Sequence, residues 1–178
     1  MESIEHLTIK KSLYDSLHKK GFKVTLEPNV LKSKPDIMID NVCGNKLAIE
    51  IQKNYISVNT ILSRMKNHTE AGAYTLWLIP ESILLKLIYN KKWCDIIQKL
   101  QNGFVFLPYS EGRILPARID VFLGKKKKYI DYYHTPIEIN ELTFENNCGY
   151  NLTYWKEWWL EGYMEILELG ECNSIRLT

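Results

Sequence analysis

Apolar and polar residues follow two periods along the first half of the chain. A spacing of three to four residues predicts helices, and alternation or a short dense apolar run predicts strands. The predicted helices cover residues 3–20 and 57–71, and the predicted strands cover residues 22–27, 35–40, 46–53 and 74–79. Gly21 ends the first helix, and Ser57 is placed to cap the second. The order α-β-β-β-α-β predicts an α/β domain.

The second half of the chain carries a weaker pattern. The elements predicted there are helices at residues 82–89, 93–101 and 151–162 and strands at residues 104–107 and 113–122. The last helix contains the aromatic run YWKEWW, whose spacing indicates packing on the core. Because about 55 residues rarely form an independent core, we expect a domain of residues 1–123, with residues 124–178 as a C-terminal α+β extension packed on it.

The predicted strand KLAIEIQK, residues 46–53, gathers polar residues on a single face. Successive side chains of a strand point to opposite faces, so Glu50 and Gln52 lie opposite Ile49 and Ile51. A carboxylate among aliphatic neighbours is costly to bury without a cation or hydrogen-bond donors. We therefore expect Glu50 and Gln52 to point at a polar site. Lys53 has the other parity and is expected to point away from it.

A second carboxylate, Asp36, follows Pro35 at the start of the preceding strand. A turn around Gly44 separates the two strands, and a hairpin between them would bring Asp36 near the far end of the Glu50 strand. Two carboxylates with a backbone carbonyl, here that of Ile51, suit Mg²⁺ with several waters retained. Such an ion polarises phosphates and activates water. The alternative is a charged hairpin edge in which Asp36 is only a turn residue.

The first predicted helix carries two polar residues inside its apolar stripe. That stripe is defined by Leu7, Leu13, Tyr14 and Leu17. His6 and Lys10 fall within it and, four residues apart, lie on one face of the helix. A lysine that points toward a core needs an anionic partner, which a cluster of carboxylates or a bound phosphate would supply. Alternatively, Lys10 extends to solvent and His6 is an ordinary core histidine.

Further basic residues indicate a surface for nucleic acid. Arg64 borders the buried stripe of the second predicted helix and suits bidentate contact with a phosphate or a carboxylate. That stripe consists of Ile61, Leu62 and Met65. A basic block after a predicted strand would make binding to a phosphate backbone depend on salt. The predicted nucleic-acid contacts are Arg64, His68, Lys125, Lys126, Lys127 and Lys128. The alternative is that these side chains are simply solvated.

Composition narrows the class of protein. The 178 residues are 46% apolar and 25% charged, with a net charge of +2, which is typical of a globular domain. The cysteines lack the paired spacing of a zinc ribbon; they are Cys43, Cys94, Cys148 and Cys172. No apolar run approaches the roughly 20 residues of a membrane span, and the first residues carry no apolar signal-peptide core. We expect a cytoplasmic protein with no membrane contact.

Several short motifs occur in an order that resembles a known family. They are ESIEHLTIK at residues 2–10, Pro35-Asp36, AIEIQ at residues 48–52, Ile56-Ser57 with Arg64, and LWLIP at residues 76–80. Several short motifs in one order are more specific than any one alone. In this arrangement the chain resembles the nuclease-like domain of the competence protein CoiA, which belongs to the PD-(D/E)xK nuclease superfamily. The resemblance covers residues 1–80 and implies a restriction-endonuclease-like core, with a central mixed sheet flanked by helices.

The resemblance also implies roles for single residues. It matches Asp36 and Glu50 to the acidic ligands of Mg²⁺, or of Mn²⁺ in its place. Gln52 stands where many superfamily members carry a lysine. Lys10, arriving from the first helix, is then the candidate substitute for that lysine. His6 would orient water or contact the phosphate.

Together these patterns predict a metal-dependent nuclease that hydrolyses phosphodiester bonds of DNA. Lys10, helped by Gln52 or His6, would stabilise the charge that develops on the phosphate. One rival interpretation is a catalytically inactive nuclease fold that binds DNA or assists DNA processing, since Gln52 replaces the usual lysine. A second rival is an interaction or regulatory protein that keeps the fold for packing alone. His68, where the family pattern tends to have tyrosine, is a further departure.

Overall fold

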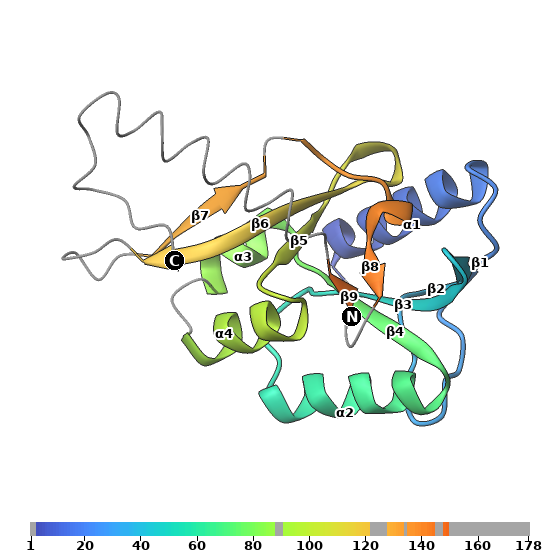
Figure 1. The fold of residues 1–178 in the computed structure, drawn as a ribbon, viewed down its shortest axis with the longest axis horizontal. Coiled ribbons are helices and arrows are strands. Elements are labelled where there is room, and N and C mark those ends of the chain that lie inside the picture. Colours follow the sequence, from blue (N-terminus) through green and yellow to red (C-terminus); the bar gives the residue numbers. More distant parts are fainter. Residues whose placement is uncertain (1–2, 88–90, 122–127, 134, 145–147, 150–178) are drawn as a thin grey trace.

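A computed structural model of the chain describes residues 3–87, 91–121, 128–133, 135–144 and 148–149 (Figure 1). Each of the two long helices begins at a serine. The Ser3 hydroxyl accepts a hydrogen bond from the His6 backbone N–H at 3.2 Å, and the Ser57 hydroxyl accepts one from Thr60 at 3.1 Å. The helices are α1 (Ile4–Lys19), α2 (Val58–Glu70), α3 (Glu81–Leu87) and α4 (Lys91–Leu100), with 3₁₀ turns η1 (Ser110–Gly112) and η2 (Ile139–Glu141).

Seven strands of the described residues form one mixed sheet in the order β1-β2-β3-β4-β5-β6-β7. They are Val24–Leu26, Ile37–Val42, Asn45–Ile51, Ala73–Leu78, Val105–Pro108, Ile114–Val121 and Lys128–Tyr132. β3, β4 and β5 run parallel to one another, and the other neighbours pair antiparallel. Strands β8 (Thr143–Phe144) and β9 (Cys148–Gly149) pair separately. The predicted central mixed sheet and the order α-β-β-β-α-β are confirmed.

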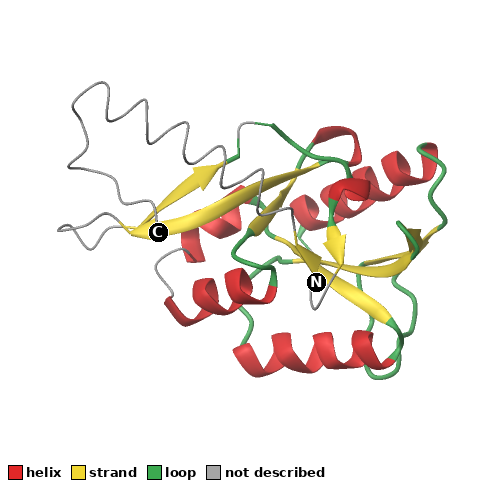
Figure 2. Cartoon of the chain, viewed as in Figure 1, coloured by secondary structure: helices red, strands yellow, loops and turns green. Residues whose placement is uncertain are grey.

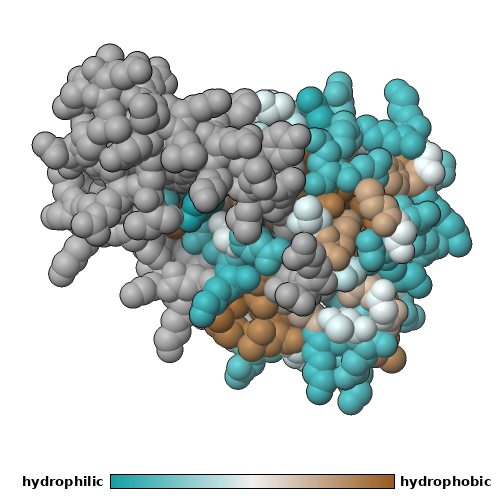
Figure 3. Space-filling view, in the orientation of Figure 1, coloured by the Kyte–Doolittle hydropathy of each residue, from teal (hydrophilic) through white to brown (hydrophobic). Residues whose placement is uncertain are grey.

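Helices flank the sheet on both faces (Figure 2). Leu13 and Leu17 of α1 pack in one hydrophobic cluster with Leu78 of β4. Ile61 of α2, together with residues of α3 and α4, packs in a second cluster with Trp77. Because adjacent strand residues point to opposite faces, these clusters lie on the two sides of the sheet. Figure 3 shows hydrophobic side chains gathered where α2 and α4 approach each other, and hydrophilic ones over α1.

The buried side of α1 includes both of its predicted polar residues. Its buried residues are His6, Lys10, Leu13 and Leu17. Their spacing of four, three and four places them along one face of the helix, and Leu7, beside that face, is 45% exposed. On α2, Leu62 is likewise 45% exposed, whereas Ile61 is buried. The predictions that put Leu7 and Leu62 in the buried stripes are wrong, because each leucine lies one residue round the helix from the packed face.

Part of the predicted C-terminal extension adds to the same sheet and the same core. β7 pairs antiparallel with β6, with Ile130 opposite Ile119. Ile137 and Leu142 join the hydrophobic cluster beneath α1. The division of the chain between residues 123 and 124 stays a prediction.

Some sequence predictions fall where the structure describes nothing. The aromatic helix predicted at residues 151–162 lies outside the described residues, as do Lys125, Lys126 and Lys127. Lys128 is the first residue of β7, and only its backbone is described. Within the described ranges, no helix combines the length and apolarity needed to cross a bilayer.

Candidate active site

A bulge in the β2–β3 hairpin determines which residues of the two strands face each other. At the turn Val42 pairs with Asn45, whereas farther along Ile37 pairs with Ile49. Between these two pairs β2 contains one residue more than β3, which is a β-bulge. A register shift of one residue gives every residue of a strand a new partner on the neighbouring strand. It also moves each side chain to the opposite face of the sheet. When the shifted register is continued by one residue, the two predicted carboxylates stand opposite each other.

Asp36 and Glu50 line one cavity of about 520 Å³ at this end of the hairpin. Asp36 lies just before β2, and its Oδ2 accepts a hydrogen bond from the backbone N–H of Ile51 at 2.8 Å. Glu50 lies on β3 with only 3% of its side chain exposed. The predicted convergence of these two side chains is therefore present in the structure.

Helix α1 places two buried basic residues against Asp36. The Nε2 atom of His6 lies 3.3 Å from Asp36 Oδ1, and the Nζ atom of Lys10 lies 3.7 Å from the same oxygen. Lys10 also donates a hydrogen bond to Glu27. His6 is 2% exposed and Lys10 is 6% exposed. The position of Lys10 requires an anionic partner, since an unpaired buried charge is costly. Lys10 therefore points at the carboxylates and not toward bulk solvent.

Helix α2 supplies the partners of Glu50. Arg64 Nη1 donates to Glu50 Oε2 at 2.7 Å, and His68 Nε2 faces Glu50 Oε1 at 3.5 Å. The other nitrogen of His68, Nδ1, is 2.9 Å from the hydroxyl of Thr75 on β4. Because His68 is fully buried, it offers no surface to a nucleic acid, and its predicted role as a nucleic-acid contact is corrected. His68 instead faces Glu50 from within the fold.

Burial shifts the protonation of both partners in this pair. Burial, assisted by the charge of Asp36 and opposed by Arg64, raises the pKa of Glu50 to about 7. Burial, together with the Arg64 charge, lowers the pKa of His68 to about 4. A neutral His68 can donate to Glu50 only from Nε2, in which case Nδ1 accepts the Thr75 hydrogen. The Thr75 hydroxyl, which can donate or accept, is compatible with that tautomer.

The residues after Glu50 only partly follow the predicted alternation. Gln52 is 4% exposed, lines the cavity and donates from Nε2 to the backbone carbonyl of Asn54. Lys53 also lines the cavity, and its charge lowers the pKa of Glu50 against the larger effect of burial. The prediction that Lys53 points away from the site is wrong, because β3 ends at Ile51 and strand alternation does not extend beyond it.

Glu27 and Lys34 are charged residues of this cavity that the sequence predictions did not name. Glu27, directly after β1, receives hydrogen bonds from Lys10 and Lys34, which lower its pKa to about 2. Lys34 Nζ lies 2.8 Å from Glu27 Oε2. Glu27 has a positive φ of 44°, which is uncommon outside glycine and asparagine. In the sequence, Glu27 is marked only as a charged residue that ends a predicted strand and precedes Pro28.

The donor set of the cavity fits a hard divalent cation with few protein ligands. Mg²⁺ is usually held by one or two carboxylates and keeps several waters. Asp36 and Glu50 supply two carboxylates, and the Oε1 atom of Glu50 is buried without a hydrogen bond among the described residues. The described ranges contain no group of three or more histidine, cysteine, aspartate or glutamate side chains placed to hold a metal. Ile51, whose carbonyl is the third predicted ligand, also lines the cavity.

Comparison with known proteins agrees with the motifs of the sequence. The family model described as "Competence protein CoiA, nuclease-like domain" matches residues 2–110, more than half of the chain. Searches of curated proteins and of solved structures gave no match. The matched span contains every residue of the cavity described above. The chain therefore belongs to the family of the CoiA nuclease-like domain.

Proposed function

We propose that this protein is a metal-dependent nuclease that hydrolyses phosphodiester bonds of DNA. One observation carries the proposal: Asp36 and Glu50 share a cavity, and Lys10 is buried against Asp36 from α1. Packing alone does not require such a cluster, because buried ionic groups are rarely more stabilising than apolar residues of the same volume. Membership of a nuclease-like family supports the same chemistry.

Each residue of the cavity has a part in this proposal. Asp36, Glu50 and the carbonyl of Ile51 would hold Mg²⁺ or Mn²⁺. There the metal would supply polarisation of a phosphate oxygen and a more acidic water. Lys10 provides positive charge near the phosphate, the role in which a fixed cation stabilises developing negative charge. His6, within 3.3 Å of Asp36, orients that carboxylate.

The decisive experiment removes the charge of Glu50 while keeping its shape. Purified wild-type protein is expected to cleave DNA in Mg²⁺ or Mn²⁺ and to stop when a chelator is added. Glu50→Gln is expected to reduce cleavage below detection, because one of two acidic ligands is lost. It should also abolish the rise in melting temperature that Mn²⁺ gives the wild type, since a ligand stabilises only the protein that binds it.

The matched control is Glu70→Gln, a change of the same type on α2 at a residue that is 53% exposed and paired with Lys66. It should leave cleavage and the Mn²⁺ response unchanged. Mg²⁺-dependent cleavage that persists in folded Glu50→Gln protein contradicts the proposed function.

Gln52 favours a second candidate, a DNA-binding protein of nuclease fold without hydrolytic activity. Its amide, which replaces the usual lysine, is committed to the Asn54 carbonyl. This candidate expects salt-sensitive DNA binding in a mobility-shift experiment, with no cleavage in either metal. The same purified protein therefore distinguishes the two.

A further inference from the structure

A second hollow adjoins the cavity and contains no carboxylate. It has a volume of about 480 Å³ and lies between the loop of residues 32–34 and helix α2. Lys34 and Arg64 line both this hollow and the cavity, so the two are neighbours. The remaining lining consists of Lys32 and neutral serine, threonine and asparagine side chains. We call this hollow, with its three cations, the basic groove.

One wall of the basic groove is a polar face of α2. Asn59, Ser63 and Asn67 line it and follow one another at intervals of four residues, which places them in a row along the helix. The opposite side of the same helix buries Ile61 and His68. α2 thus faces the core with one side and presents hydrogen-bonding groups to the groove with the other.

The other wall is a tight loop with a fixed shape. Val30 and Ser33 exchange two backbone hydrogen bonds, at 2.9 and 2.8 Å. The Ser33 hydroxyl donates a third, to the Val30 carbonyl, at 3.0 Å. Lys32 lies inside this closed loop and is exposed. The loop is held by its own hydrogen bonds. A ligand that binds Lys32 therefore does not have to order the backbone first.

The three cations of the groove differ in their ion pairs. Lys34 pairs with Glu27, and Arg64 pairs with Glu50, both at the border with the cavity. Lys32 forms no ion pair with a residue that the structure describes. The lining of the groove carries positive charge, while the carboxylates that pair with two of its cations line the cavity. Such a lining attracts anions.

We propose that the basic groove binds the phosphate backbone of the nucleic-acid strand whose neighbouring phosphodiester lies in the cavity. This inference rests on the proposed function, because it takes the cavity as the place where the scissile phosphate binds. Lysine, arginine, serine and asparagine are the usual contacts of phosphate oxygens, and they position a strand without reading its sequence. The groove thus sets the path of the substrate and gives no base preference of its own.

Binding of a short fluorescent oligonucleotide, measured by anisotropy in a chelator at several salt concentrations, tests this proposal. Without a divalent ion the oligonucleotide stays intact, so binding is measured apart from hydrolysis. Lys32→Ala is expected to weaken binding roughly five-fold at low salt and to reduce the slope of log K against log salt by about 1. Lys32→Glu should weaken binding further.

The matched control is Lys66→Ala, also a lysine, on α2 but outside the groove and 77% exposed. It should bind like the wild type. The proposed role of the groove is contradicted if both variants lose binding equally or if neither loses it. It is also contradicted if the wild-type protein does not bind the oligonucleotide. If Lys32→Ala alone changes the salt slope while the wild type never hydrolyses DNA with Mg²⁺ or Mn²⁺, the groove stands and the proposed hydrolysis fails. A melting temperature near that of the wild type verifies that each variant is folded.

Discussion

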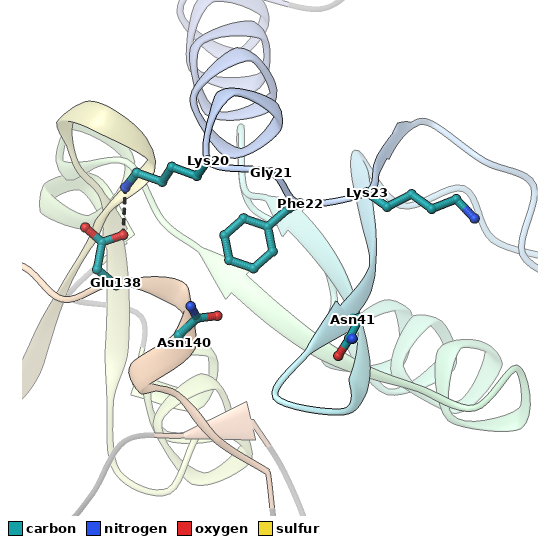
Figure 4. Close-up of a pocket in the computed structure, with 7 residues that line it drawn as sticks. All are labelled: Lys20, Gly21, Phe22, Lys23, Asn41, Glu138 and Asn140. Atoms are coloured by element: carbon teal, nitrogen blue, oxygen red, sulfur yellow. Dashed lines mark hydrogen bonds and ion pairs between the residues drawn. The ribbon is translucent and has the colours of Figure 1, made fainter.

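The two ends of helix α1 both adjoin a polar hollow, but they hold their charges differently. At the N-terminal end, His6 and Lys10 are 2% and 6% exposed and lie against Asp36. At the C-terminal end, Lys20 and Lys23 line a hollow of about 660 Å³ (Figure 4). The larger hollow is therefore the one at the end of α1 that buries no charge.

Ion pairs at the C-terminal end lie at the surface. Lys20 reaches Glu138 at 2.6 Å, and Lys23, which points away from the hollow in Figure 4, reaches Asp40 at 2.8 Å with 82% of its side chain exposed. Water solvates these charges whether or not they pair, so their attraction contributes little. The buried charges of the cavity have no such alternative. Burial, more than the size of a hollow, indicates where charge is held for chemistry.

Of the substitutions that test this difference between the two ends of α1, the one at Lys10 is expected to have the largest effect. Lys10→Met keeps the length of the side chain but removes the buried charge. Asp36 keeps His6 and the Ile51 N–H, and Glu27 keeps Lys34, so the fold should persist. We expect cleavage of DNA to fall by about 10² to 10³-fold at saturating metal, mainly in kcat, because the lost charge acts on the transition state.

Lys11→Met is the matched control, since it changes the next residue of α1, which is exposed. It should leave kcat and KM unchanged. Equal cleavage rates in folded Lys10→Met and Lys11→Met protein would remove Lys10 from the proposed mechanism.

A smaller effect is expected for a substitution of His68, which contacts Glu50 from behind the cavity. His68→Leu removes the group that faces Glu50 Oε1 and leaves the Thr75 hydroxyl without its ring partner. Residues that orient a metal ligand typically change metal affinity by about 10 to 100-fold. The Mn²⁺ concentration that gives half of the maximal rise in melting temperature should increase by that factor.

Thr69→Ala, a change at an exposed residue of the same helix, should not alter this Mn²⁺ midpoint. Thr75→Val should shift it in the same direction as His68→Leu but by less, because the imidazole remains. An unchanged midpoint in folded His68→Leu protein would reduce His68 to a packing residue.

The elements of the fold could be predicted because their patterns are local. Helical spacing and alternation are properties of short segments, and α1, β3 and α2 each lie within two residues of their predicted bounds. The last strands of the described chain were missed because they are short and carry no dense apolar run. β7 pairs with β6, and the hydrophobic pattern of β7 alone does not record that pairing.

The structure brings His6 and Lys10 against Asp36 and places Asp36 and Glu50 in one cavity, as the sequence predicts, while their functional roles stay predictions. His6, Lys10 and Glu50 were identified because a polar residue on an apolar face needs a partner. The bulge that sets Asp36 opposite Glu50 left no signal in the hydrophobic pattern. The contacts of Glu27 with Lys10 and of Thr75 with His68 join different elements, so they depend on how those elements pack and leave no mark in the pattern of either one.

The smallest effect is expected at the exposed end of α1, for Lys23→Ala. Lys23 lowers the pKa of Asp40, so the contribution of the pair to stability is complete above the ordinary pKa of a carboxyl group. That contribution disappears as the pH falls through the lowered pKa of Asp40. Because Lys23 is solvated in both the folded and the unfolded chain, we expect no measurable change in melting temperature at pH 7 in moderate salt. A clear loss of stability in Lys23→Ala, comparable with that of a buried substitution, would show that exposure does not separate the two ends of α1.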